Sequence, residues 1–272
     1  MAEGRITDVE TIRAMVAGHS PWYHQIALGG GVVTPGPHPS TTVLAELDGL
    51  GLPKDASGLR VLDIGCRDGF FAFAMEKRGA EVIGLDYAEP DVTGFSVAAR
   101  VLASKVTYVV ENVYNLDAGK LGTFDLVLFL GVLYHLRNPM LALDRIREVT
   151  RTGGQLFVRS QTATDAAVQS LTVPVYQFFP RDELVGDATS KWGPNLEGLK
   201  RTVEESRFEV LQTHVTGGRA SLAARAVDDA TLDFYRKLDA EVGLHGKAVN
   251  TDQKMLPDDG TAPPKTKRPA DD

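Results

Sequence analysis

Apolar runs and helically spaced apolar residues alternate through the middle of the chain. Runs that are apolar at nearly every position predict strands buried on both faces, and they cover residues 60–64, 81–86, 106–110, 124–130 and 154–159. Between these runs, apolar residues recur at helical spacing and predict helices over 70–78, 91–103 and 139–150. Strands that alternate with helices favour a parallel sheet covered on both faces, which is the doubly wound α/β architecture.

The chain on either side of this region is patterned differently. Short helices are predicted over residues 8–18 and 40–50, and between them residues 29–37 hold too many glycines and prolines for a helix. Near the other end, two apolar runs flank Gly217-Gly218 as the strands of a hairpin do, and they cover residues 208–215 and 220–226. We therefore expect a Rossmann-like sheet of seven strands, mostly parallel, with a C-terminal β-hairpin and an N-terminal helical cap.

Composition narrows the class of protein. Of the 272 residues, 43% are apolar, which is enough for a sizeable core, and the single cysteine, Cys66, excludes an intramolecular disulfide. The net charge of −7 argues against a general nucleic-acid binder, whose surface usually carries a basic patch. The N-terminus lacks the apolar core of a secretory signal, and no run approaches the roughly 20 apolar residues of a membrane span. We expect a soluble, cytoplasmic protein with no membrane contact and no metal site.

A glycine turn follows the first strand of the alternating region. Gly65 and Gly69 bracket this turn, and glycine there tolerates positive φ and lets the backbone approach a ligand. The dinucleotide fingerprint G-x-G-x-x-G does not fit, because Arg67 stands where its second glycine would be. Asp86 ends the second strand, 21 residues after Gly65, where a doubly wound sheet places a carboxylate within reach of a ribose diol. A strand-to-helix turn without a ligand is the alternative.

The pattern D-x-G-x-x-x-G over residues 63–69 resembles motif I of class I S-adenosylmethionine-dependent methyltransferases. The resemblance implies S-adenosylmethionine as cofactor, with its amino-acid end at the glycine turn and its adenine beside Asn112. The positions assigned to the cofactor in this way are Trp22, Asp63, Gly65, Gly69, Asp86, Tyr87, Asn112, Val113 and Leu130. For Trp22, a core anchor of the first helix is an equally simple interpretation.

The fourth strand leads into Gly131-Val132-Leu133-Tyr134-His135, at the strand end where open α/β sheets bind ligands. Methyl transfer is an in-line displacement that needs alignment and, for a protonated nucleophile, a base. His135 is the first candidate base because an imidazole titrates near neutral pH, and Tyr134 and His24 are the further catalytic candidates. A capping or packing role is the alternative for both histidines.

Three segments together are similar to the wobble-uridine tRNA methyltransferase-like family, which modifies 5-hydroxyuridine. They are Trp22-Tyr23-His24 with its glycine-rich continuation, residues 131–139, and Trp192-Gly193-Pro194-Asn195. Some members use carboxy-S-adenosylmethionine and hold its extra carboxylate with an N-terminal lysine, a late arginine and the tyrosine that Tyr134 matches. Here no lysine or arginine lies between Trp22 and Lys54, and the neighbours of Arg219 do not match the late segment. We therefore expect S-adenosylmethionine in preference to its carboxylated form.

Aromatic residues after the fifth strand predict where an acceptor binds. The predicted substrate-binding residues are Tyr176, Phe178, Trp192 and Asn195, in an insertion that would cover the carboxyl ends of the strands. An aromatic lid suits a planar small molecule or a stacked base, and ordinary packing beneath a long loop is the alternative.

Three functions follow from these features. The first is methylation of a small-molecule acceptor at an oxygen. The second is wobble-uridine modification of tRNA, which the acidic charge disfavours. The third is a cofactor-binding interaction protein without turnover.

The predicted boundaries follow the same features. Residues 1–58 form the cap and cofactor lid, and residues 59–227 form the methyltransferase domain, with residues 160–195 inserted over the substrate. A C-terminal helix is expected within residues 228–250. Residues 251–272 are rich in proline, lysine and aspartate, and we expect them to be disordered. No particular oligomeric state is predicted.

Overall fold

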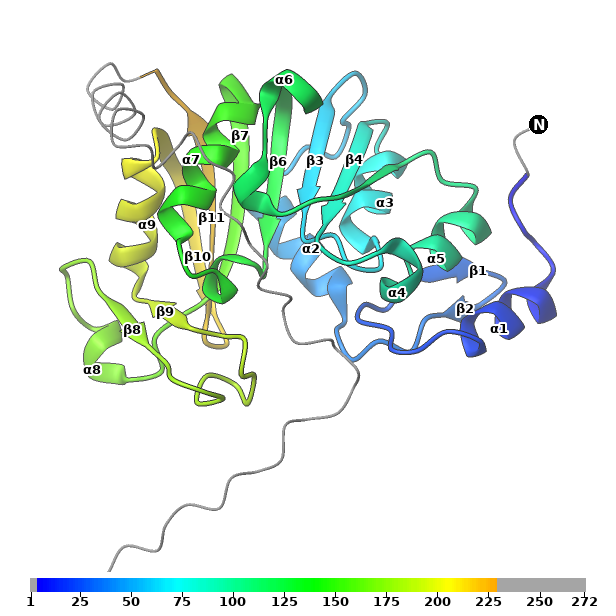
Figure 1. Ribbon diagram of the computed structural model, residues 1–272, viewed down its shortest axis with the longest axis horizontal. Coiled ribbons are helices and arrows are strands. Elements are labelled where there is room, and N and C mark those ends of the chain that lie inside the picture. The colour runs from blue at the N-terminus through cyan, green and yellow to red at the C-terminus, as the bar shows by residue number, and fades with distance from the viewer. Residues whose placement is uncertain (1–3, 229–272) are drawn as a thin grey trace, which may run out of the picture.

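Seven strands form one sheet through the centre of the protein (Figure 1). In the computed structural model, which describes residues 4–228, they are β3 (Arg60–Ile64), β4 (Glu81–Asp86), β5 (Thr107–Val110), β6 (Phe124–Leu130), β7 (Thr150–Gln161), β10 (Phe208–Thr216) and β11 (Arg219–Ala226). Their order across the sheet is β10-β11-β7-β6-β3-β4-β5. The strands from β3 to β7 run parallel, whereas β11 pairs antiparallel with β7 and β10 with β11. The predicted fold class is confirmed, including the C-terminal hairpin.

The strand boundaries follow the apolar runs closely. β3, β4 and β6 have the predicted bounds, because each is a mostly buried apolar run that ends at a turn. β7 is longer than the predicted 154–159, since Thr150 continues directly from helix α7 (Pro139–Val149) and the strand extends to Gln161 to pair with β11. In that pairing, Arg219 lies opposite Gln161 and Ser221 lies opposite Arg159.

Helices connect the parallel strands. α3 (Phe70–Lys77) and α7 confirm the predicted helices 70–78 and 139–150. The predicted helix 91–103 is two helices, α4 (Pro90–Thr93) and α5 (Phe95–Leu102), because Gly94 between them has a φ of 85° and interrupts the helical path. Three short turns complete the connections, α6 (Ala118–Leu121), η1 (Val113–Asn115) and η2 (Leu133–His135).

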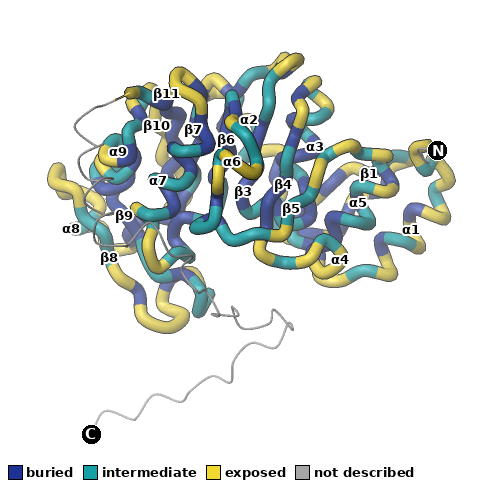
Figure 2. Tube along the Cα trace, turned by 45° about the horizontal axis from the view of Figure 1, so that its top comes forward, coloured by how far each residue is buried: buried dark blue, intermediate teal, exposed yellow. Residues whose placement is uncertain are grey.

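Two apolar layers hold the helices to the sheet. On one face, α7 and α9 (Leu196–Glu205) pack on β6, β7 and the hairpin through residues that include Leu143 and Leu199. On the other face, α2 (Ser40–Gly49) and α3 pack through residues that include Leu47 and Phe157. Figure 2 shows the central strands largely buried beneath loops and outer helix turns that are exposed. The alternation of side chains along β7 directs Arg159 to the α2 face, with Phe157.

The flanking segments lie on the side of the sheet where the parallel strands end (Figure 1). α1 (Val9–Ala17) confirms the predicted helix 8–18, with Asp8 as its N-cap, and is followed by the short strands β1 (Ala27–Gly29) and β2 (Val32–Val33). This N-terminal segment packs on α5 through a third apolar cluster that contains Trp22 and Phe95. After β7, the chain forms α8 (Ala166–Gln169) and an antiparallel pair, β8 (Tyr176–Phe178) and β9 (Trp192–Pro194).

Two predictions concern the chain beyond residue 228 and so lie outside the described residues. The first is the C-terminal helix within residues 228–250, of which only residue 228 is described. The second is the tail, residues 251–272. Within residues 4–228, no helix combines the length and the apolar character needed to cross a membrane.

Candidate active site

The turn after β3 depends on two glycines at the carboxyl edge of the sheet. Gly65 and Gly69 have φ of 73° and 94°, which is the left-handed conformation that glycine favours. A Cβ on Gly65 would collide with the side chain of Val132, and one on Gly69 would collide with the ring of Phe73. The turn can therefore close against its neighbours only with glycine at both positions.

Asp63 places a buried carboxyl group directly before this turn. Its side chain is shielded from solvent, and Oδ2 has no hydrogen-bond partner among the described residues. Burial raises the pKa of Asp63 to about 7; the N–H of Ala72 opposes this rise and the charge of Asp86 adds to it. Because an unpaired buried carboxylate is costly, this position favours a ligand that brings a positive charge or a donor.

Asp86, at the end of β4, is fixed beside the glycine turn. Its Oδ2 accepts a hydrogen bond from the N–H of Arg67 at 3.0 Å, and its Oδ1 accepts one from the N–H of Ala88 at 3.1 Å. Burial raises the pKa of Asp86, while the N–H groups of Ala88 and Arg67 and the charge of Arg67 lower it. Each carboxylate oxygen can accept a second hydrogen bond, so the group can hold two adjacent hydroxyls. The next residue, Tyr87, is exposed.

The loop after β5 lies next to Asp86 along the carboxyl edge of the sheet. The N–H of Glu111 donates to the carbonyl of Asp86 at 2.9 Å, so the loop after β5 lies beside the acid. Asn112 caps η1 with its side-chain oxygen, which accepts from the N–H of Tyr114 at 3.0 Å, and Val113 is buried behind it. Leu130 ends β6 and is half-buried. The structure thus brings the predicted cofactor residues, apart from Trp22, to the ends of four neighbouring strands.

A second buried acid, Asp68, ties the N-terminal segment to the glycine turn. Its Oδ2 accepts hydrogen bonds from the N–H of Tyr23 at 2.9 Å and of His24 at 2.7 Å, and its Oδ1 contacts Nδ1 of His24. Burial acts to raise the pKa of Asp68, but the hydrogen bonds and charge of His24 and the N–H of Tyr23 outweigh it, so the pKa is lowered. Trp22 is buried in the core, and its indole N–H donates to the carbonyl of Val16 at 3.1 Å. Both Trp22 and His24 therefore have structural partners.

His135 belongs to a chain of three polar side chains. The Thr189 hydroxyl donates to Oδ1 of Asp187 at 2.6 Å and lies 2.9 Å from Nδ1 of His135. Since the single hydroxyl proton is directed at the carboxylate, Nδ1 is the donor to Thr189, and Nε2 carries the free lone pair. Burial lowers the pKa of His135, and the charge of Asp187 and the bond to Thr189 offset part of the shift. The imidazole is therefore neutral at pH 7 and able to accept a proton.

Tyr134 and the residues after it connect η2 to the long insertion. Tyr134 is buried, and its ring centroid lies 4.2 Å from that of His135. The carbonyl of Tyr134 accepts from the N–H of Lys191 at 2.8 Å, and the carbonyl of Leu136 accepts from the indole N–H of Trp192 at 2.9 Å. These bonds fasten the insertion to the loop that carries the candidate base.

The other predicted acceptor residues divide into two groups. Phe178 is exposed and packs on Trp192, with ring centroids 5.2 Å apart. The hydroxyl of Tyr176 donates to Thr202 of α9 at 2.7 Å. Asn195 is buried: its oxygen caps α9 by accepting from the N–H of Gly198, and its amide donates to the carbonyls of residues 171 and 173. The polar groups of Tyr176 and Asn195 are thus engaged within the fold.

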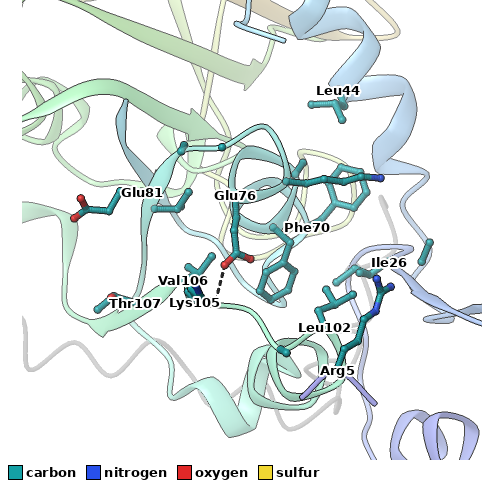
Figure 3. A pocket seen from close by; sticks show the side chains of 18 residues that line it. Arg5, Ile26, Leu44, Phe70, Glu76, Glu81, Leu102, Lys105, Val106 and Thr107 are labelled. Carbon is teal, nitrogen blue, oxygen red and sulfur yellow. Dashed lines mark hydrogen bonds between the residues drawn. The ribbon is translucent and has the colours of Figure 1, made fainter. Parts of the chain in front are cut away.

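A cavity of about 930 Å³ lies away from these residues, against α3, α5 and the starts of β4 and β5 (Figure 3). Leu44, Phe70, Leu102 and Arg5 contribute to its lining, and Glu76 reaches across to accept a hydrogen bond from the N–H of Lys105. None of the predicted site residues lines it. Within residues 4–228, no group of three His, Cys, Asp or Glu side chains is placed to hold a metal ion.

The sequence of the sheet region matches a known family. Residues 42–213, more than half of the chain, match the family described as methyltransferase domain. The chain belongs to this methyltransferase family. Together with the sheet topology, this confirms the predicted class, that of S-adenosylmethionine-dependent methyltransferases.

Two curated relatives of this methyltransferase show how far the similarity reaches. The chain is 31% identical over 122 residues to a ubiquinone biosynthesis O-methyltransferase of Xanthomonas oryzae pv. oryzae, over 45% of this chain and 51% of that protein. It is 37% identical over 106 residues to a tRNA U34 carboxymethyltransferase of Campylobacter hominis, over 38% of this chain and 36% of that protein. The methyltransferase thus spans about half the length of the first relative and about a third of the second.

A solved structure shares the fold of the methyltransferase. It is the 1,6-didemethyltoxoflavin-N1-methyltransferase of Burkholderia thailandensis, with 1,6-didemethyltoxoflavin and S-adenosylhomocysteine bound. The TM-score is 0.51 at 18% identity, and the match covers 70% of this chain and 78% of that one. At this identity, the likeness concerns the fold.

Several polar residues that lie near the predicted site residues are absent from the sequence prediction. Asp68 lies inside the glycine motif, directly before Gly69, and an acid at that place was a signal for a buried partner. Arg159 interrupts the apolar run of β7, which was a signal for a charged group at the strand end. Thr189 and Asp187 carry no such signal, because they reach His135 only through the folding of a long insertion.

Proposed function

We propose that the protein uses S-adenosylmethionine to methylate a small molecule at an oxygen. The observation that carries the proposal is the row of Asp63, Gly65 and Asp86 along the strand ends, with a neutral, hydrogen-bonded His135 on the next loop. In this arrangement, a methyl donor and a proton acceptor serve the same edge of the sheet. The relative named as an O-methyltransferase supports oxygen as the accepting atom.

The residues present fit the cofactor. The unpartnered Oδ2 of Asp63 suits the ammonium group of the cofactor's amino-acid end, and the glycine turn leaves room for its backbone contacts. Asp86 suits the ribose diol, because its oxygens are already oriented by two N–H groups. Asn112 and Val113 would flank the adenine. When bound, S-adenosylmethionine supplies an activated methyl group at its sulfonium.

The chain's own part in the chemistry is alignment and proton removal. In this proposal, Nε2 of His135 accepts the proton of the acceptor hydroxyl, while Nδ1 stays bound to Thr189. Asp187 stabilises the imidazolium that forms, at 3.9 Å from Nδ1. The Phe178 and Trp192 rings would cover a planar acceptor.

Calorimetry with S-adenosylmethionine tests the cofactor assignment. We expect binding by the wild type and at least about a tenfold loss of affinity in Asp86→Ala, because a charged group that accepts two hydroxyl bonds is removed. Asp165→Ala is the matched control, since Asp165 is an exposed acid that caps α8. No binding by the wild type, or full affinity in Asp86→Ala, would contradict the proposal.

A tRNA wobble uridine is the second candidate acceptor, favoured by the similarity to the tRNA U34 carboxymethyltransferase. Mass spectrometry of bulk tRNA from a deletion strain separates the two functions. We expect the uridine modifications to be unchanged. Loss of a wobble-uridine modification, restored by the intact gene, would replace the small-molecule proposal.

A further inference from the structure

Two arginines share the α2 face of the sheet near its carboxyl edge. Arg159 lies on β7 and Arg219 begins β11. Because Arg219 is opposite Gln161 and Ser221 is opposite Arg159, the two arginines are diagonal neighbours on one face. Neither residue belongs to the proposed cofactor site or to the hydrogen-bonded series that ends at His135.

The pair is linked to the loop that carries the candidate base. Leu130 of β6 pairs with Arg159, and the N–H of Gly131 donates to the carbonyl of Arg159 at 2.8 Å. A Cβ on Gly131 would lie 3.6 Å from the Tyr134 hydroxyl, so this hydroxyl is turned back toward the same strand end. Arg159, on β7, therefore lies one strand from β6, which leads into the loop of the candidate base, and Arg219, on β11, lies one strand further away.

The positive charge of the pair is only partly balanced. Oε1 of Glu46 lies 3.5 Å from Nε of Arg159 and also accepts a hydrogen bond from Ser221. Nε of Arg159 is buried without a hydrogen-bond partner among the described residues. Nη2 of Arg219 donates to the side-chain oxygen of Gln161 at 3.0 Å, in the amide orientation that satisfies both neighbours of Gln161. Within residues 4–228, Glu46 is thus the carboxylate paired with Arg159, and the printed partner of Arg219 is the neutral amide of Gln161.

Among residues 4–228, the other titratable groups around the pair form no salt bridge with Arg159 or Arg219. Burial lowers the pKa of His38, and His24, Arg219 and Arg159 lower it further against a smaller effect of Asp68, so His38 is neutral at pH 7. The nearby carboxylates contact other side chains, Asp68 with His24 and Asp187 with Thr189 and His135. Within residues 4–228, Arg159 is therefore paired with Glu46 alone, and Arg219 is not paired with a carboxylate.

We propose that Arg159 and Arg219 bind a carboxylate of the methyl acceptor and so select acidic small molecules. The inference rests on the proposed function, because it names the substrate class of the same site. A guanidinium fork matches a carboxylate in geometry, and the bond is stronger in a partly buried site than at the surface. The side chain of Arg159 is 14% exposed, so it is sheltered from bulk solvent without being fully buried.

Matched neutral and anionic probes test this inference on the full chain saturated with S-adenosylhomocysteine. The probes are benzoate against benzamide and 4-hydroxybenzoate against 4-hydroxybenzamide, with binding measured by calorimetry. The variants are Arg219→Gln, which removes the charge, and Arg159→Lys, which keeps the charge and removes the fork. Arg225→Gln is the control, because Arg225 lies on the same strand and pairs with Glu209 at the far end of the hairpin.

We expect each carboxylate to bind at least about tenfold more tightly than its amide, since a charge-assisted bond is lost in the amide. Arg219→Gln should abolish this preference, Arg159→Lys should weaken it, and Arg225→Gln should preserve it. S-adenosylhomocysteine affinity should be the same in all four proteins. Thermal unfolding of each variant shows whether it is folded.

Three results would overturn the inference while leaving the cofactor site intact. They are equal affinity for carboxylate and amide, no binding of either probe, and a preference that survives in Arg219→Gln. If carboxy-S-adenosylmethionine binds more tightly than S-adenosylmethionine, and Arg219→Gln removes the difference, the carboxylate belongs to the methyl donor and the inference is wrong. Failure of S-adenosylhomocysteine to bind the wild type would contradict the proposed function and, with it, this inference.

Discussion

At the scale of single residues, the balance between burial and hydrogen bonding decides which groups of the site are charged. Asp63 and Asp68 are both buried acids within one short motif. The pKa of Asp63 is raised because burial outweighs a single N–H, whereas the pKa of Asp68 is lowered because His24 and two N–H groups outweigh burial. Asp63 is therefore suited to a ligand, and Asp68 to holding the fold.

The raised pKa of Asp63 predicts a pH-dependent gain of stability in Asp63→Asn. The folded pKa of about 7 exceeds the ordinary value of 3.8, so the stability that this group contributes is present below about pH 4 and lost as the pH rises through 7. Asparagine does not ionise. In the ligand-free protein, we expect the substitution to stabilise by roughly 2–4 kcal/mol at pH 8 and to have little effect at pH 4.

Denaturant unfolding at the two pH values measures this difference. The same variant should bind S-adenosylmethionine poorly, because the anionic partner of its ammonium group is lost. Equal effects on stability at pH 4 and pH 8 would show that Asp63 does not titrate between them.

The chain of His135, Thr189 and Asp187 predicts how the imidazole titrates. The charge of Asp187 raises the pKa of His135 against burial, so Asp187→Asn should move that pKa further below 6.5. NMR titration of the His135 ring measures the shift without requiring a known acceptor. Asp182→Asn, in the same insertion, is the control and should leave the titration unchanged.

The hydrogen bonds that link His135, Thr189 and Asp187 also predict effects on turnover. His135→Ala should lower kcat by about 10²–10⁴-fold with a smaller change in KM, because a general base acts mainly in the transition state. Thr189→Val should have a smaller effect of the same kind, since it only releases Nδ1. Full activity in His135→Ala would assign the histidine to packing.

At the scale of elements, the N-terminal segment is attached to the sheet through few polar contacts. Among residues 4–228, β1 and β2 pair only with each other, so they do not extend the seven-stranded sheet. Besides an apolar cluster with α5, the segment's attachment includes the bonds from Tyr23 and His24 to Asp68 and the ring contacts of His24 with Phe70 and Phe71. Asp68 is therefore the buried carboxylate that joins this segment to the glycine turn.

Asp68→Ala should accordingly destabilise the protein by about 3–5 kcal/mol, because two N–H groups and His24 lose a buried partner. Hydrogen exchange of the Tyr23 and His24 amides should accelerate more than exchange in β3. Asp165→Ala, at an exposed cap, should cost no more than about 1–2 kcal/mol. Unchanged protection of the two amides would show that other contacts hold the segment.

The pH dependence of this contact has a defined sign. The folded pKa of Asp68 is below its ordinary value, so its contribution is present above about pH 4 and lost as the pH falls through the folded pKa. The wild type should therefore lose the advantage over Asp68→Ala in acid, which denaturant unfolding at pH 3 and pH 7 would measure.

At the scale of the whole molecule, local patterns predicted the fold and long-range contacts decided the site. The bounds of β3, β4 and β6 follow from apolar runs, and the glycine turn follows from the φ that Gly65 and Gly69 allow. These are properties of neighbouring residues. The break at Gly94 was the main local error, because the helical pattern of residues 91–103 continues through a glycine that adopts positive φ against Trp22.

The polar partners of the site could not be predicted in the same way. The sequence neighbours of Arg219 do not match the late segment of the resembled family, yet the pairing of β11 with β7 places Arg219 diagonally across from Arg159. Likewise, His24 meets Asp68 only because the N-terminal segment folds back over the turn. Such contacts depend on strand register and loop path, which no periodicity in a single sequence contains.

The distribution of charge over the molecule leads to a last prediction, about tRNA. The net charge is −7, and of the two arginines proposed to bind the acceptor, Arg159 is largely buried beside Glu46 and Arg219 is half-buried. Binding to a phosphate backbone requires several accessible cations and weakens steeply with salt.

We expect bulk tRNA to bind with a Kd weaker than about 10⁻⁴ M near physiological salt, which is the weak end of non-specific binding. The salt dependence of this binding should be shallow. Fluorescence anisotropy with labelled tRNA between 50 and 200 mM salt measures both quantities. Micromolar affinity with a steep salt slope would require a phosphate-binding surface that Arg159 and Arg219 cannot provide, and would favour the tRNA function over the small-molecule one.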